Sequence, residues 1–564
     1  MKTAPEPLAP IPFHLSEPFE TRLKNGLRIV LCENDRLPLI NFRLAFYSGD
    51  ADEPSDAIGL TSAVAALLTE GTENYSSREL AEKVDRLGAH LSANSSEDFL
   101  VIAASALAMY EADLIDLLAE VLFRPTFPES ELSLYKRNTI ENLKFQRSQP
   151  NFLANEQVGR ILYGEHPYAT ISPSPDDIEK LKRQSLQEHH ASSLVPNNAV
   201  LIVVGDFEQD QLLAKLEEVF DRHWPKGEPP KREFDTPPDR SAVTITIVDR
   251  PGSAQANIVL SNLAAKRNDP DYFAAVVMNQ VLGAGASSRV FMNLREEKGY
   301  TYGAYTRLNM KKLAGDFEAT AEVRTAVTGD SIREFLYELK RIRETPVSED
   351  ELADAKNFLK GVFPIRAETQ EGLTNLIVNQ QLYGLPQDYL QTYRENIDAV
   401  TADDVQWAAA KLIQPEKLAF VIVGDGREIL AQTSEFASDI EIYDTEGTKK
   451  DMAELTAEPA APASDLSGKW SLSLDFQGQK VPVTLKIEQE GAVVTGTLDT
   501  ILGSGTISGG RVTGNKLTAT ATTEMQGEAV EFTINAEVES DSITGTITAP
   551  IVPNALPFTG TRDN

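Results

Sequence analysis

The sequence contains one cysteine, Cys32, in 564 residues, so an internal disulfide is excluded and a reducing compartment is favoured. Long apolar runs are also missing, since no stretch approaches the roughly 20 apolar residues that a membrane-spanning helix requires. The first 18 residues hold five prolines and no apolar segment of signal-peptide length. We therefore expect a cytoplasmic protein, or a periplasmic one if a signal peptide has been removed.

Positive charge is scarce as well. The chain has 53 lysines and arginines against 85 aspartates and glutamates, which gives a net charge of −32. Nucleic acids and anionic membrane surfaces bind basic patches, so neither is expected as a partner.

Histidine is rare, with six in the chain and one adjacent pair, His189-His190. No second group of ligands lies near this pair in the sequence. We therefore expect both side chains to face solvent rather than to bind a metal. His166 precedes Pro167, and we expect it to cap or close a turn.

An internal repeat is the main long-range pattern that the sequence does contain. Any one short match could arise by chance, but four in the same order at one offset indicate a duplication. The matches, offset by 219 or 220 residues, are Glu131-Leu132 with Glu351-Leu352, Leu162-Tyr163-Gly164 with Leu382-Tyr383-Gly384, Asp177-Ile178 with Asn396-Ile397, and Val203-Val204-Gly205-Asp206 with Ile422-Val423-Gly424-Asp425.

Composition and periodicity divide the chain into five parts. Each repeat combines helical spacing with short apolar strands that end in Gly-Asp, which predicts an α+β sandwich of a sheet covered by helices. The stretch that joins the repeats is proline-rich and charged, and the one after them is acidic and rich in alanine and proline. We expect a first domain at 15–224, a linker at 225–242, a second domain at 243–436, a flexible linker at 437–465 and a β module at 466–564.

The last module shows no helical periodicity. Gly-rich turns separate segments that alternate and carry Val, Ile and Thr, which predicts a small, closed or nearly closed antiparallel barrel. Gly468-Lys469-Trp470 resembles the opening of lipocalin-like barrels, where an arginine near the end packs over the tryptophan, so we expect Arg562 over Trp470. An open sandwich with Trp470 in its core is the alternative. The segments expected as strands are Val481–Ile487, Val493–Leu498, Lys516–Thr522, Val530–Val538 and Ile543–Ile547.

Residues 59–72 have a frame, Gly59-Leu60 to Gly71-Thr72, that resembles the zinc-binding helix of the pitrilysin/insulinase family of peptidases. That helix reads Gly-Leu-x-His-x-x-Glu-His-x-x-x-x-Gly-Thr. On this frame the two metal histidines fall on Ser62 and Ala66, and the general-base glutamate falls on Ala65. Alanine offers no lone pair to zinc and no base to deprotonate a water. We expect no metal in this chain and no peptide cleavage by this chain alone.

The resemblance spans roughly residues 15–435. It includes Leu23–Leu31, with its Asn25-Gly26 turn before an apolar strand, together with His166-Pro167-Tyr168 and Pro196–Val200. Glu141 lies near the region where the family keeps a downstream zinc-ligand glutamate. A lone carboxylate cannot hold zinc, so we expect Glu141 to be a surface helix residue.

The second half resembles the second-half signature of the same family, a glycine-rich loop followed by an arginine and a tyrosine seven positions later. In the family this pair reaches the zinc site of the facing domain, and by position its roles fall on Arg295 and Tyr302. A phenol donor can stabilise the negative charge that develops on a zinc-bound carbonyl, and an arginine fork can hold a carbonyl or carboxylate. We expect loop residues to contact substrate, namely Gly283, Gly285, Ser287 and Ser288.

Two other interpretations of this segment are open. Arg295 could be an ordinary exposed helix charge, and Tyr302 an aromatic residue of an edge strand. A phosphate-binding loop at Gly283-x-Gly285 is rejected, because the third glycine is absent and an apolar helical stretch precedes it.

The resemblance implies two homologous sandwich domains that form half of a peptidase chamber. It also implies a non-catalytic, substrate-binding subunit of a heterodimeric zinc metallopeptidase, in which Arg295 and Tyr302 act on a partner's zinc site. Zinc is then expected in the homologous partner, with no cofactor in this chain, and peptides are the expected substrates. The alternatives are a scaffold or peptide-binding protein without a catalytic role, and a homodimer that binds peptides without hydrolysing them.

Overall fold

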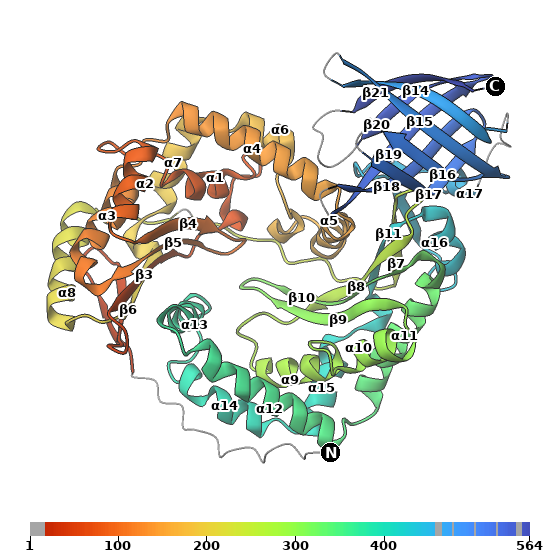
Figure 1. Cartoon of the computed structure of the whole chain (residues 1–564). Coiled ribbons are helices and arrows are strands. Elements are labelled where there is room, and N and C mark those ends of the chain that lie inside the picture. Colours follow the sequence, from red (N-terminus) through yellow and green to blue (C-terminus); the bar gives the residue numbers. More distant parts are fainter. Residues whose placement is uncertain are drawn as a thin grey trace, which may run out of the picture.

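A computed structural model describes residues 17–229, 231–456, 465–476, 479–500, 503–525, 528–548 and 555–563 of the protein. Two units that mix helices and sheets are followed by a separate barrel (Figure 1). This architecture confirms the predicted α+β class with an added antiparallel barrel.

The first half is built on a six-stranded sheet ordered β1-β2-β6-β3-β5-β4, in which only β2 and β6 run parallel. The turn at Asn25-Gly26, where Gly26 has a φ of 104°, leads into β2 as predicted. β6 is buried along its whole length because both faces of the sheet are covered. The strands are β1 (Phe19–Arg22), β2 (Arg28–Glu33), β3 (Leu39–Phe46), β4 (His90–Ser95), β5 (Leu100–Leu107) and β6 (Ala199–Gly205).

The second half repeats this topology. Its order is β13-β12-β7-β11-β8-β10-β9, so β7-β11-β8-β10-β9 matches β2-β6-β3-β5-β4, including the parallel pair at β7 and β11. The duplication expected from the four repeated strings is therefore present in the fold. The strands are β7 (Thr244–Asp249), β8 (Gln255–Ala264), β9 (Thr301–Met310), β10 (Gly315–Arg324), β11 (Ala419–Gly424), β12 (Ile440–Tyr443) and β13 (Lys449–Lys450).

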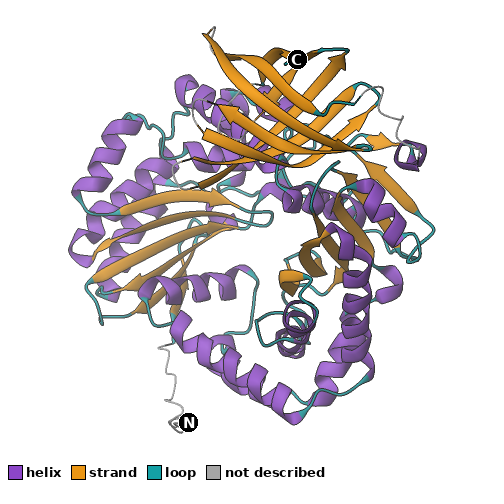
Figure 2. Ribbon diagram, turned by 45° about the vertical axis from the view of Figure 1, so that its right-hand side comes forward, coloured by secondary structure: helices purple, strands orange, loops and turns teal. Residues whose placement is uncertain are grey.

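Each half covers one face of its sheet with its own helices (Figures 1 and 2). In the first half these are α1 (Leu60–Leu67), α2 (Ser77–Arg86), α3 (Glu111–Phe123), α4 (Glu129–Arg147), α6 (Pro175–Lys180), α7 (Arg183–Ser193) and α8 (Gln209–Leu216). In the second they are α9 (Tyr272–Leu282), α10 (Arg289–Phe291), α11 (Thr328–Glu344), α12 (Glu349–Arg366), α14 (Tyr389–Ala399), α15 (Ala402–Leu412) and α16 (Gly426–Thr433).

The other face of each sheet is covered by a helix from the opposite half. Helix α5 (Pro150–Tyr163) leaves the first half and packs on β8 and β11, with Val158 and Leu162 against Val259 and Val421. Helix α13 (Gln370–Leu382) leaves the second half and packs on β3 and β6. The repeated strings that end in Gly164 and Gly384 close these two helices, so the exchange follows the duplication.

None of the helices within the described ranges combines the length and the apolar character needed to cross a lipid bilayer.

The segment 437–465 was expected to be a flexible linker, but its first part forms two strands and a short helix. Ile440 and Ile442 place β12 beside β7, β13 follows, and α17 (Met452–Thr456) buries Leu455 against the second half. The turn between β12 and β13 reaches the first half, since Arg147 donates to the carbonyl of Thr445 at 3.4 Å. The alternation of Ile440 and Ile442 is a strand signal, but it is too short to stand out in a segment of acidic composition. Residues 457–464 lie outside the described ranges.

The C-terminal module is a closed barrel of eight strands in chain order, and β14 pairs with β21, so the open sandwich is excluded. Arg562 lies 5.6 Å above the ring of the buried Trp470, as expected. The glycine-rich stretch at 503–513, which was not among the expected strands, forms β17, and a Cβ at Gly510 would lie 2.8 Å from that of Val494. The strands are β14 (Gly468–Phe476), β15 (Gln479–Glu490), β16 (Val493–Thr500), β17 (Gly503–Thr513), β18 (Lys516–Met525), β19 (Glu528–Glu539), β20 (Ser542–Thr548) and β21 (Leu556–Arg562).

Candidate functional site

One of the two positions that would hold a metal, Ser62, belongs to a hydroxyl–carboxylate network. Ser62 on α1 lies 2.8 Å, oxygen to oxygen, from Ser95 at the end of β4, and donates to the Oδ1 of Asp50 at 3.3 Å. Ser95 donates to the same Oδ1 at 2.7 Å. Burial raises the pKa of Asp50, while the two hydroxyl donors lower it. The network ties α1 to β4 and to the short 3-10 turn η1 (Asp50–Asp52).

A second carboxylate holds the start of the same helix. Glu53 accepts hydrogen bonds from the backbone N–H of Gly59, at 2.7 Å, and of Thr61. Burial, together with the nearby charge of Asp50, raises the pKa of Glu53 to about 7, against the effect of the two backbone donors. Helix α1 is therefore positioned by these side chains.

The residues present do not fit zinc. Ala65 is buried and Ala66 is half-buried, and a serine hydroxyl paired with a carboxylate is no substitute for imidazole. Within the described ranges, no group of three or more His, Cys, Asp or Glu side chains is arranged to hold a metal ion. Glu141 is exposed and forms an ion pair with Lys144 at 2.7 Å, which confirms it as a surface helix residue.

The two adjacent histidines are not solvent-facing, so that expectation is wrong. His189 is buried, with Nε2 3.0 Å from Oγ1 of Thr61, and burial lowers its pKa to about 4. The ring of His190 is hydrogen-bonded to the carbonyl of Leu122 at 2.8 Å. His189 turns inward where α7 packs against α1, whereas His190 turns toward Leu122 of α3. His166 does cap a turn, as expected, by accepting from the N–H of Tyr168 at 3.1 Å.

The glycine-rich loop joins α9 to α10 and lies against β9. Thr306 donates its N–H to the carbonyl of Gly283 at 2.9 Å, and a Cβ at Gly283 would lie 2.3 Å from the Thr306 hydroxyl. This close approach requires glycine. Gly285 is half-buried and Ser287 is exposed. Ser288 is buried at the start of α10, and its hydroxyl has no partner among the described residues.

Arg295 and Tyr302 lie on two elements that pack together. Arg295 is in η6 (Met292–Glu297), a π-helical turn; it pairs with Glu296, and its guanidinium lies 5.1 Å from the ring centre of Phe291. Tyr302 lies at the start of β9, the edge strand of the second sheet, and is 90% exposed. An almost fully exposed phenol at a sheet edge is available to a partner molecule.

An ion pair that the sequence analysis missed anchors the segment before Arg295. The buried Arg289 donates to Glu351 through Nε, at 2.7 Å, and through Nη2, at 2.9 Å. Hydrogen bonding by Arg289 lowers the pKa of Glu351 to about 2. The repeat had singled out Glu351, which belongs to the string Glu351-Leu352. Its counterpart, Glu131, did not indicate that Glu351 would pair with an arginine.

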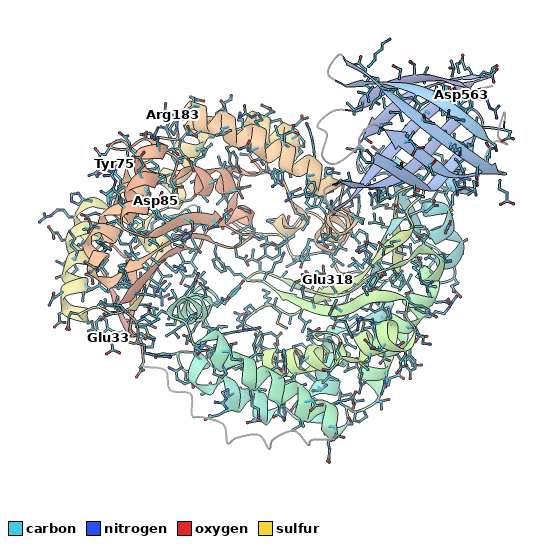
Figure 3. All side chains as sticks on the ribbon, viewed as in Figure 1. Glu33, Tyr75, Asp85, Arg183, Glu318 and Asp563 are labelled. Atoms are coloured by element: carbon cyan, nitrogen blue, oxygen red, sulfur yellow. The ribbon has the colours of Figure 1, made fainter. Side chains whose placement is uncertain are left out.

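The two halves also meet through polar side chains. Tyr163 of α5 donates to Asp316 of β10 at 2.5 Å, and Lys311 pairs with Glu97 at 2.6 Å. Burial raises the pKa of Asp316, and Glu318, on the side of the second sheet turned toward the first half (Figure 3), has its pKa raised by burial as well. These contacts join the β9–β10 hairpin to the first half.

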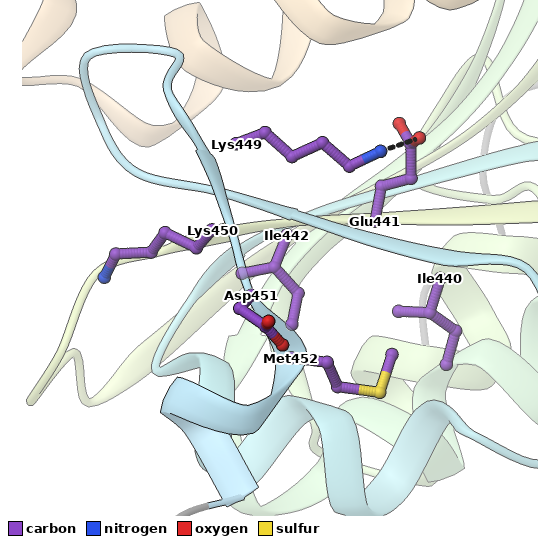
Figure 4. A pocket seen from close by; sticks show the side chains of 7 residues that line it. All are labelled: Ile440, Glu441, Ile442, Lys449, Lys450, Asp451 and Met452. Atoms are coloured by element: carbon purple, nitrogen blue, oxygen red, sulfur yellow. Dashed lines mark hydrogen bonds and ion pairs between the residues drawn. The ribbon is translucent and has the colours of Figure 1, made fainter.

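A pocket of about 470 Å³ lies at the opposite edge of the second sheet from β9 (Figure 4). Lys449 pairs with Glu441 at 2.5 Å and Lys450 with Asp249 at 3.0 Å, so its charges are largely matched. The pocket contains none of the residues predicted from the sequence. Its lining residues are Ile440, Glu441, Ile442, Lys449, Lys450, Asp451 and Met452.

Comparison with known proteins identifies relatives over the first two thirds of the chain. A family model described as insulinase (peptidase family M16) matches residues 28–175, and one described as the peptidase M16 inactive domain matches residues 180–359. A protein of Helicobacter pylori named non-peptidase homolog YmxG is 25% identical over 402 residues, covering 71% of this chain and 92% of the relative. The uncharacterized zinc protease YmxG of Bacillus subtilis is 24% identical over 411 residues, covering 72% of this chain and 97% of the relative.

Solved structures agree with this grouping. A peptidase M16 inactive domain from Pseudomonas fluorescens superposes with a TM-score of 0.68 at 26% identity, over 72% of this chain and 97% of that one. A protease from Helicobacter pylori also gives a TM-score of 0.68, at 18% identity, over 72% of this chain and 99% of that one. The second match supports the fold alone.

Proposed function

Because the chain belongs to the insulinase (M16) family of peptidases, we propose that it is a non-catalytic subunit of a zinc metallopeptidase. In this proposal a homologous partner carries the intact His-x-x-Glu-His motif, and this chain supplies Arg295 and Tyr302 to the partner's zinc site. The observation that carries the proposal is an asymmetry between the halves. The first half has Ser62, Ala65 and Ala66 at the positions of the zinc ligands and the general base. The second half presents the exposed side chains of Arg295 and Tyr302.

The partner's zinc would polarise the scissile carbonyl and the attacking water. The part of this chain would be to hold the peptide and stabilise charge. The Tyr302 phenol can donate a hydrogen bond to the developing oxyanion, and its 90% exposure leaves the hydroxyl free to do so. The planar Arg295 guanidinium can hold a peptide carbonyl or carboxylate with two parallel hydrogen bonds. Peptides are accordingly the proposed substrates.

The names of the relatives support the two parts of this proposal. One relative is named a non-peptidase homolog, which fits a chain without the zinc ligands. Others are named zinc proteases, which fits the existence of homologous chains that carry them. A complex of one chain of each kind is the proposed working form.

A second function, a scaffold or peptide-binding protein without a catalytic role, is favoured by the glycine-rich loop. Gly283 is required by its contact with Thr306, and Ser288 is buried. Two of the four residues expected to contact substrate are therefore used in packing. A homodimer that binds peptides is a form of this second function.

The test is a peptide-cleavage assay of this chain together with a homologous chain that carries the intact motif. Tyr302→Phe keeps the ring and removes the hydroxyl, so kcat should fall about 10²-fold while assembly is unchanged. Arg295→Ala should raise KM as well, because a positioning contact is lost. Tyr337→Phe, at an exposed tyrosine of α11, is the matched control. Wild-type kinetics in both site variants would favour the scaffold.

A further inference from the structure

One strand of the proposed site carries a tyrosine whose ring folds back over a glycine. A Cβ built on Gly303 of β9 would lie 2.7 Å from Cε2 of Tyr305 and 3.0 Å from its hydroxyl oxygen. Side chains do not approach a Cβ that closely, so the ring can lie there only because residue 303 has no side chain. Tyr305 is 45% exposed, with one part of its ring covered and the other open to solvent.

The covered part of Tyr305 continues into a stack that ends at Arg295. Its ring centre lies 5.7 Å from that of Phe291, with the planes tilted by 50°. Phe291 is buried and carries the Arg295 guanidinium 5.1 Å from its own ring centre. Phe291 and Arg295 are four residues apart on consecutive helical turns, so they lie on one face. Gly303, Tyr305, Phe291 and Arg295 are thus in continuous contact from β9 to η6.

Arg295 also forms an ion pair with the neighbouring Glu296. Both side chains are more than 40% exposed, and an exposed ion pair between adjacent residues does little to fix a side chain. The buried ring of Phe291 is a more rigid neighbour of the Arg295 guanidinium than the exposed Glu296 side chain. The guanidinium thus lies against Phe291, and the ring of Phe291 lies against Tyr305.

We propose that Tyr305 is a positioning residue that, through Phe291, aims Arg295 at a peptide carbonyl or carboxylate, and that Gly303 is needed to seat its ring. This inference rests on the proposed function, in which Arg295 binds the peptide. A guanidinium binds such groups through two parallel N–H donors, so its orientation decides how well it binds. Displacing the Tyr305 ring then weakens peptide binding without removing any group that touches the peptide.

The experiment compares full-length variants in complex with the zinc-binding partner. Gly303→Ala pushes the ring away and Tyr305→Ala removes it, so both should raise KM about 10-fold, with a smaller effect on kcat. Tyr305→Phe keeps the ring and should recover most of the wild-type KM. The double variant Tyr305→Ala/Arg295→Ala should be no worse than Arg295→Ala alone, because both changes remove one function. Tyr337→Ala, at an exposed tyrosine away from β9, is the control for loss of a surface ring.

Additive effects in the double variant would overturn the proposal, as would a wild-type KM in Gly303→Ala and Tyr305→Ala when Arg295→Ala raises it. A second measurement needs no partner and separates this inference from the proposed function. The Arg295 side-chain N–H, assigned by its loss in Arg295→Lys, should show an upfield NMR shift from the Phe291 ring. That shift should shrink in Tyr305→Ala and persist in Tyr305→Phe. A shift unchanged in both variants would reject the stack even if the complex cleaves peptides.

Discussion

The hydroxyl of Thr61 and the imidazole of His189 meet in the core of the first half, 3.0 Å apart, and join α1 to α7. Both residues are buried, Thr61 at 1% and His189 at 7% exposure. Thr61 directly precedes Ser62, so polar contacts hold α1 on one side through α7 and on the other through β4. A helix that lacks its metal ligands is thus cross-linked by hydrogen bonds.

Stability should fall in acid because of His189. Burial lowers the pKa of this imidazole to about 4, compared with about 6.5 when exposed. Between these two values the unfolded chain binds more protons than the folded chain. The stability that the buried, neutral imidazole contributes is therefore complete above pH 6.5 and is lost as the pH falls toward 4. Denaturant titrations of the wild type and of His189→Gln at pH 7.5, 6 and 5 should converge as the pH falls, because the wild type loses about 2 kcal/mol by pH 5. The exposed His90→Gln is the control, and parallel curves for His189→Gln would contradict the assignment.

Restoring the motif should not restore a tight zinc site. The variant with Ser62→His, Ala65→Glu and Ala66→His gains two ligands and a base, but Glu141 faces solvent and pairs with Lys144. A catalytic zinc site has three protein ligands, so binding should stay weak. Elemental analysis after dialysis should find substoichiometric zinc in both the wild type and the triple variant. One zinc per chain, with chelator-sensitive cleavage by this chain alone, would contradict this.

Tyr163→Phe should weaken the contact between the two halves. The lost hydroxyl donates to the buried Asp316, which would retain a hydrogen bond from the amide of Asn309 at 2.7 Å. Leaving a buried acceptor under-satisfied costs about 1–3 kcal/mol, measurable by chemical denaturation. Tyr383→Phe is the matched control, because Tyr383 is the repeat counterpart of Tyr163 and meets Phe99 through its ring. Equal losses in the two variants would mean that the hydrogen bond is not the cause.

The barrel should fold by itself. A fragment of residues 466–564 contains one tryptophan, Trp470, whose indole N–H donates to the carbonyl of Leu466 at 3.0 Å. It should melt cooperatively, and Arg562→Ala should cost about 0.5–2 kcal/mol and shift the Trp fluorescence, because the cation lies over the indole. Arg511→Ala, at an exposed arginine of β17, should leave both signals unchanged. A non-cooperative melt would show that the barrel depends on the rest of the chain.

Local signals predicted much of this fold. The Asn25-Gly26 turn, the His166 cap and the repeated strings each depend on a few neighbouring residues, and all appear where expected. What escaped prediction depends on contacts between distant residues. His189 is buried because α1 packs on it from 128 positions away, and nothing in its own neighbourhood shows this. The same holds for the network at Ser62, whose partners Ser95 and Asp50 come from other elements.

The exchange of α5 and α13 has the geometry of a domain-swapped pair whose two members have been joined end to end. If the second half were deleted, the sheet of the first would expose an apolar face that includes Val30, Ala45 and Ile202. Neither half is therefore a complete folding unit. The connecting stretch at 225–242 turns what would be an association between two molecules into an intramolecular step, at an effective concentration in the millimolar range. Dilution cannot separate the halves, so the body should unfold as one unit at any protein concentration.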